Sequence, residues 1–119
     1  MALKRIILEM GTGNDLYGED YTKAACRAVQ DALHHSSLSL FNTLGIDRDA
    51  MQVGVTIGVQ QPHLVDTQQL VSQIPYGQVQ VNVQTGGLNV VDDDTGSVSV
   101  IAAAAVEVRI DLPEGRYRL

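Results

Sequence analysis

Two polar segments of the sequence carry residue types that acid–base chemistry needs. The first, "GTGNDLYGED" at residues 11–20, sets carboxylates beside glycines, and the second, "QQPHLVD" at residues 60–66, sets an imidazole beside amides. A carboxylate and an imidazole within hydrogen-bond reach can exchange protons with a substrate, and glycines let a ligand approach the backbone. The candidate catalytic residues are Asp15, His35, His63 and Glu9, and the candidate ligand-binding residues are Gly11, Gly13, Asn14, Gln60 and Gln61.

The glycine segment does not have the pattern of a nucleotide-binding loop. A dinucleotide fingerprint needs a third glycine where Leu16 stands, and a P-loop needs a lysine followed by serine or threonine, which is missing here. The carboxylates of Asp15, Glu19 and Asp20 precede a helix N-terminus and would repel phosphate there. No nucleotide and no other cofactor is expected.

The remaining residues that could bind metal or react as a thiol have simpler interpretations. His34 and His35 are adjacent, so their side chains diverge on a helix and cannot chelate one ion as an i, i+4 pair would. The "DDDTG" segment from Asp92 lacks the glutamate of a calcium loop and is typical of a turn. The single cysteine, Cys26, lies in an alanine-rich helical run, which is typical of a core thiol. No metal site is predicted.

Hydrophobic periodicity predicts the elements that would position these residues. Strands are expected at residues 4–10, 51–59, 78–85 and 97–110, and helices at 21–35 and 67–74. The order β-α-β-α-β-β predicts an α+β fold with a single four-stranded mixed sheet and helices packed on one face. The pattern of the first helix leaves open a continuation to Gly45. The chain is expected to form one domain, 1–119, with a loosely ordered tail at 111–119.

The predicted topology places the two polar segments close together. If the strands at 4–10 and 51–59 flank the first helix in a right-handed parallel βαβ unit, both end at the same edge of the sheet, where ligands tend to bind. His35 would lie ~20 Å along the helix from the glycine segment at 1.5 Å per residue, so only an oligomer could bring it to Asp15. Two polar surface loops without a function fit the sequence equally well.

One face of the predicted sheet is left without helices. It would carry Ile7, Thr56, Ile101 and Ala103, and such a half-apolar face is often covered by another subunit. The sequence therefore favours a homo-oligomeric small-molecule-binding protein or small enzyme, with a polar site formed by the loops at 11–20 and 60–66 and placed at a subunit interface. The alternative is a non-catalytic assembly or interaction module.

Charge and hydropathy exclude two classes of partner. The net charge of −6, without a basic stripe interleaved with aromatics, argues against nucleic-acid binding. No apolar run approaches the ~18 residues that a membrane span needs, and the N-terminal apolar run is too short for a signal peptide. A cytoplasmic protein without a membrane partner is expected.

The segment "EMGTGNDLYGEDYTKAACRAVQDALHHSSL" resembles a family of small bacterial proteins, with plant relatives, known as conserved hypothetical proteins of unknown function. The resemblance continues through "LGIDRDAMQVGVTIGV" to "AAAAVEV", and the glycine segment and "HHSSL" carry it most specifically. It implies no activity and transfers no catalytic residue. It supports a specific role, of unknown chemistry, for Glu9, Gly11, Gly13, Asp15 and His35.

Overall fold

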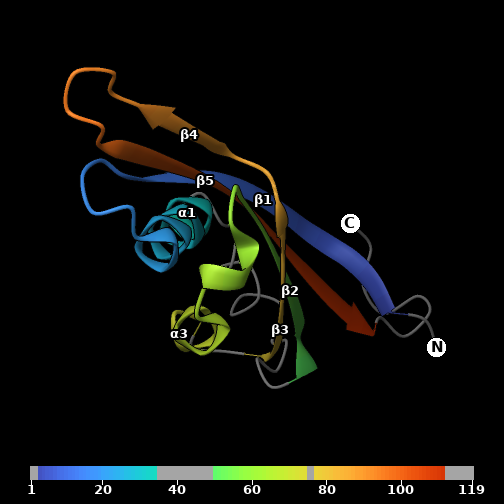
Figure 1. Cartoon of the computed structure of the whole chain (residues 1–119). Coiled ribbons are helices and arrows are strands. Elements are labelled where there is room, and N and C mark those ends of the chain that lie inside the picture. The colour runs from blue at the N-terminus through green and yellow to red at the C-terminus, as the bar shows by residue number, and fades with distance from the viewer. Residues whose placement is uncertain (1–2, 35–49, 75–76, 112–119) are drawn as a thin grey trace.

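A computed structural model describes residues 3–34, 50–74 and 77–111 of the chain (Figure 1). The elements are β1 (Leu3–Asp15), α1 (Tyr21–His34), β2 (Gln52–Val59), the 3-10 turn η2 (Pro62–Leu64), α3 (Thr67–Ser72), β3 (Gln78–Thr85), β4 (Leu88–Val91) and β5 (Val98–Asp111). The candidate residue His35, the continuation of the first helix and residues 112–119 of the expected tail lie outside the described residues, whereas Asp111 ends β5.

The strands form one mixed sheet in the order β1-β5-β2-β3, with β4 also paired to β5. Strand β5 is antiparallel to both β1 and β2, whereas β2 and β3 are parallel. Strands β1 and β2 therefore run in the same direction with β5 between them. The predicted α+β class with a single mixed sheet is confirmed, but the count of four strands is wrong, because the described residues already contribute five.

The additional strand, β4, depends on a partner far along the chain. It pairs with the first residues of β5, from Val91 opposite Val98 to Leu88 opposite Ile101, beyond the point where β2 stops pairing at Gly58. The chain reaches that place from β3 by crossing β2, where Gly86 packs on Gly58 and Gly87 adopts a φ of 61°. A four-residue strand between glycines and aspartates has no clear local signal.

The core lies between the sheet and its helices. The valines and Ile57 at alternate positions of β2 are buried, and so are alternate residues of β5 from Val100 to Ile110. Helix α1 meets them with a buried row of small residues, and Figure 1 shows α1 and α3 on the same side of the sheet. The half-buried Cys26 packs against this core. Burial raises the pKa of its thiol, and the carboxylates of Asp20 and Asp66 add to the effect.

Strand β1 is longer than the sequence pattern indicates, because the glycines expected in a loop belong to it. A Cβ on Gly11 would lie 2.5 Å from the carbonyl oxygen of Ala28, and a Cβ on Gly13 would lie 2.3 Å from that of Ala24. Both glycines therefore face α1 and allow the helix backbone to approach the strand. They are part of the packing between helix and sheet.

The same contact decides which residues of β1 face away from the helices. Because Gly11 and Gly13 must face α1, the alternation of the strand turns Leu8 and Met10 to the opposite face, where they are 43% and 69% exposed. A register shift between Arg5 and Ile7 precedes this stretch, and Ile7 packs against the core. The expectation that Ile7 lies on the uncovered face is wrong.

Candidate functional site

Asp15 ends β1 as a buried carboxylate, 5% exposed, that organises the turn into α1. Its Oδ2 accepts a hydrogen bond of 2.9 Å from the backbone N–H of Asp20. Its Oδ1 lies 3.8 Å from Nζ of Lys23 and 3.9 Å from NH1 of Arg27. The carboxylate thus holds the residues that begin the helix, which is a structural role that the sequence did not distinguish from catalysis.

Replacing Asp15 by alanine is expected to lower the free energy of unfolding by about 1–3 kcal/mol. The change leaves the Asp20 N–H without its acceptor and two cations without their counter-charge. Urea denaturation measures this change. The control is Asp94→Ala, which removes an exposed carboxylate from the β4–β5 turn. Unchanged or increased stability of Asp15→Ala would contradict the structural role, since removing a purely functional residue often stabilises a fold.

The loop at 60–66 lies beside the first turn of α1, as the predicted topology requires. The Thr22 hydroxyl donates to the carbonyl of Leu64 at 3.4 Å and accepts from the N–H of Asp66 at 2.9 Å. The Gln60 side-chain amide does not point into a shared site with Asp15. It donates to the carbonyl oxygens of Gly86 and Gly87 at 3.1 and 3.2 Å, which fixes the crossing between β3 and β4.

The other candidate residues are not gathered into one cluster by any contact that the structure describes. Asn14 is exposed, and its backbone carbonyl accepts from NH1 of Arg27. His63 is exposed on η2, and Gln61 is half-buried before it. Glu9 is half-buried in the middle of β1, opposite Val106 of β5. Among residues 3–34, 50–74 and 77–111, no group of three or more histidine, cysteine, aspartate or glutamate side chains could hold a metal ion.

The face of the sheet opposite the helices, called here the open face, carries a regular array of side chains. Four rows cross it, each with one residue from β3, β2, β5 and β1. The rows are Gln78, Gln52, Arg109 and Arg5; Gln80, Gly54, Glu107 and Leu8; Asn82, Thr56, Ala105 and Met10; and Gln84, Gly58, Ala103 and Thr12. One end of the face is thus charged, β3 presents only amides, and the centre is built from small residues.

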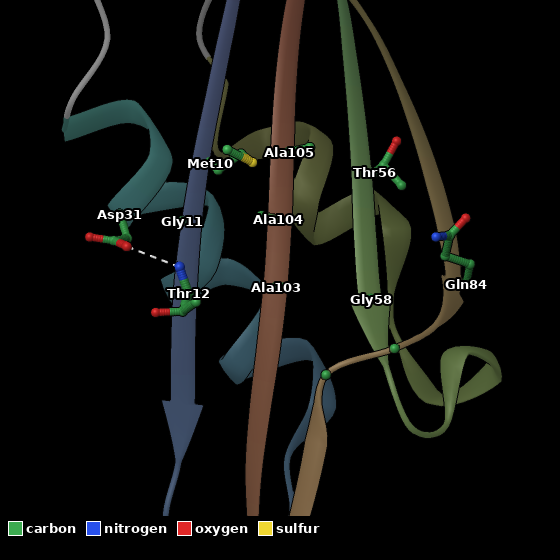
Figure 2. Close-up of a pocket in the computed structure, with 12 residues that line it drawn as sticks. Met10, Gly11, Thr12, Asp31, Thr56, Gly58, Gln84, Ala103, Ala104 and Ala105 are labelled. Atoms are coloured by element: carbon green, nitrogen blue, oxygen red, sulfur yellow. Dashed lines mark hydrogen bonds between the residues drawn. The ribbon is translucent and has the colours of Figure 1, made fainter.

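A hollow of ≈ 570 Å³, called here the trough, lies over the small residues at the centre. Its floor includes Gly58, Ala103 and Ala105, and Met10 stands at one side, leaning from β1 toward β5 in Figure 2. Thr12, Thr56 and Gln84 add hydroxyl and amide groups to the lining. The trough therefore has a mainly apolar surface with a few groups able to form hydrogen bonds.

The trough also has a carboxylate at its edge. Asp31 of α1 reaches the outer side of β1, where its Oδ2 accepts from the backbone N–H of Thr12 at 2.9 Å (Figure 2). This bond caps part of the exposed edge of the sheet. Among the lining residues that the structure describes, Asp31 is the single titratable one, so the lining resembles a binding surface more than an acid–base pair.

Sequence reasoning missed the trough as a site, although it placed Thr56 and Ala103, which line the trough, on the uncovered face of the sheet. Of the predicted site residues that the structure describes, Gly11 is the one that lines it. At Gly58 the backbone of Gly86 is a close neighbour. Alternation along β5 places Ala103 and Ala105 on the open face, where they form the floor.

Comparisons with known proteins agree with the resemblance that the sequence suggested. A family model described as "Conserved hypothetical protein (Lin0512_fam)" matches residues 5–108. A crystal structure from Nostoc punctiforme, described as an FtsZ-like protein of unknown function, is similar with a TM-score of 0.82 and 33% identity. The match covers 94% of this chain and 99% of that one. None of the curated proteins matches the chain. No helix in the described part of the chain is long and apolar enough to cross a membrane.

Proposed function

We propose that this chain, which belongs to the Lin0512 family of conserved hypothetical proteins, assembles with copies of itself through the open face and binds a small molecule in the trough. This keeps the homo-oligomeric binding protein expected from the sequence. It moves the centre of the site from the loops at 11–20 and 60–66 to the middle of the sheet.

The observation that carries the proposal is the set of large apolar side chains exposed around the trough. Leu8 and Met10 stand on β1, and Leu88 and Val90 of β4, 60% and 53% exposed, continue the same face opposite Ile101 and Ser99. Large apolar side chains exposed on one face of a protein in water mark a contact with another molecule. A second copy would cover the apolar residues and close the open side of the trough.

The lining of the trough supports a ligand with a flat apolar part. Gly58, Ala103 and Ala105 leave a low floor on which a ring or short chain could lie without displacing a side chain. The Thr56 hydroxyl and the Gln84 amide can orient it by hydrogen bonds. Binding without a reaction is favoured here, because Asp31 is the one titratable group among the described residues of the trough lining.

Replacing Ala103 by leucine tests the ligand part of the proposal. The added side chain fills the floor of the trough, so we expect the fluorescent apolar probe 8-anilinonaphthalene-1-sulfonate to bind the wild type saturably and the variant about tenfold more weakly or worse. Gln68→Leu, which adds the same side chain on the exposed surface of α3, is the control and should bind like the wild type. Equal binding by Ala103→Leu would remove the trough as the site.

A non-catalytic assembly module is the second candidate. It is favoured by the exposed apolar residues of β4, which extend the open face beyond the lining of the trough. In that case the small residues at the centre accommodate side chains of the second copy, and the probe would be excluded from the assembled protein.

A further inference from the structure

The charged end of the open face holds a second, smaller hollow, called here the notch. Its volume is ≈ 190 Å³, and it is lined by Gln52, Val53, Gly54, Gln78, Gln80 and Arg109. In contrast to the trough, its lining is dominated by side-chain amides and a guanidinium group. It adjoins the trough along β2, because Gly54 and Thr56 are successive residues of that strand on the open face.

The notch exists because residue 54 has no side chain, and the fold gives no reason for glycine there. Among residues 3–34, 50–74 and 77–111, a Cβ on Gly54 would meet no atom within 4 Å, whereas a Cβ on Gly11, Gly13 or Gly58 would meet backbone atoms. Gly54 does not have a positive φ. A glycine inside a strand costs stability through backbone entropy and lost packing, so one without a steric or conformational reason points to an occupant of the space above it.

The side chain that could attract an occupant, Arg109, is held in place by its neighbours. Its NH2 donates to Oε2 of Glu107 at 2.8 Å, and NH1 of Arg5 donates to the same oxygen at 3.3 Å. The hydrogen bond from Arg5, with that from Arg109, lowers the pKa of Glu107. The three side chains thus carry a net charge of +1, and the fixed guanidinium keeps further N–H donors beside the notch.

We propose that the notch binds an oxyanion, the carboxylate or phosphate group of a small molecule. A guanidinium group gives such a group charge and paired N–H donors, and the amides of Gln52, Gln78 and Gln80 can donate to its remaining oxygens. The inference goes beyond the proposed function, because it holds whether or not the trough is occupied. A ligand that used both hollows would have an anionic group at one end and an apolar part at the other.

Amide NMR of the full chain tests this with two probes, sodium phosphate and sodium acetate, each titrated at constant pH and ionic strength against chloride. We expect saturable shifts at the amides of β2 and β3 next to Gly54 and Gln80. A response to phosphate alone assigns a phosphate group, and a response to acetate assigns a carboxylate.

Three variants make the result specific. Arg109→Gln should weaken the response at least tenfold, and Gly54→Val should do the same while its melting temperature stays unchanged or rises by a few degrees, since the Cβ meets no described atom within 4 Å and valine favours strands. Lys4→Gln, which removes a neighbouring exposed cation outside the notch, should bind like the wild type.

Four outcomes would overturn the inference. The first two are a wild type without saturable shifts for either anion and an Arg109→Gln variant that responds like the wild type. The other two are a Lys4→Gln variant whose anion response falls as much as that of Arg109→Gln, and a Gly54→Val variant with a lower melting temperature. A loss of assembly in Arg109→Gln without any anion response would instead make the notch a contact between copies. None of these measurements depends on the trough. If anion binding in the notch is disproved, the proposed function still stands, and if the proposed function is disproved, anion binding in the notch still stands.

Discussion

Replacing Gly13 by alanine is expected to lower the free energy of unfolding by about 3 kcal/mol, the upper end of the usual range for overpacking. The new Cβ would lie 2.3 Å from both the carbonyl oxygen of Ala24 and the backbone nitrogen of Ala28. These are backbone atoms of α1, so no side-chain rotation can relieve the clash. The helix must move off the sheet, and the buried alanines that pack on β1 and β5 must move with it.

Gly54→Ala is the matched control for Gly13→Ala. It makes the same chemical change in another strand of the same sheet, but its Cβ meets no atom of the described part of the chain within 4 Å. We expect it to be neutral or to gain up to about 1 kcal/mol from the reduced entropy of the unfolded chain. Chemical denaturation of both variants checks the pair. If Gly13→Ala were as stable as the wild type, the close approach of α1 to β1 would be wrong, and the glycines would again be free to serve a ligand.

The second large effect is expected at Met10 and concerns assembly. Met10 is 69% exposed in the single chain, so Met10→Asp should leave the stability of the chain nearly unchanged. In an assembly through the open face, the new carboxylate would be buried without a partner. We therefore expect the dissociation constant of the assembly to rise at least about 100-fold. Analytical ultracentrifugation over a range of protein concentrations measures this.

Leu64→Asp is the control for Met10→Asp. Leu64 is a large apolar residue, 53% exposed, on η2 rather than on the open face. It should assemble like the wild type. If both variants dissociated equally, the effect would come from added negative charge on a chain that already carries −6. If neither dissociated, the interface would lie elsewhere than the open face.

Much of the fold could be predicted from local patterns. The alternating valines of residues 78–85 set the bounds of β3 correctly, and those of β2 did so to within one residue. The N-terminus of α3 was also correct, because Asp66 caps it by accepting from the N–H of Gln68 at 3.0 Å. Each of these signals lies within the element that it predicts, so no knowledge of the tertiary structure was required.

The failures share a cause, which is dependence on residues far along the chain. Gly11 and Gly13 suggest a loop by composition, yet β5 supplies partners as far as Asp15, and α1 requires residues without side chains. Strand β4 exists because β5 extends beyond the end of β2. Neither the pairing with β5 nor the packing against α1 can be recognised from a short stretch of sequence.

The candidate site was harder to predict than the fold. Polar residues in loops suggested catalysis at Asp15 and ligand binding at Gln60, but both side chains hold the backbone of neighbouring turns. The trough and the notch arise from register, since rows of residues from four strands become neighbours only after the sheet has formed. Alternation within their strands was enough to place Thr56 and Ala103, which line the trough, on the uncovered face.

Native mass spectrometry of the purified wild-type chain, with no ligand added, shows whether copies assemble through the open face. We expect a mass that is a whole multiple of the 12.8 kDa chain, two or more, and the mass of a single chain for Met10→Asp. An added small mass on the assembly would further support the trough. A wild-type chain that stays at 12.8 kDa at micromolar concentration would rule out the proposed assembly.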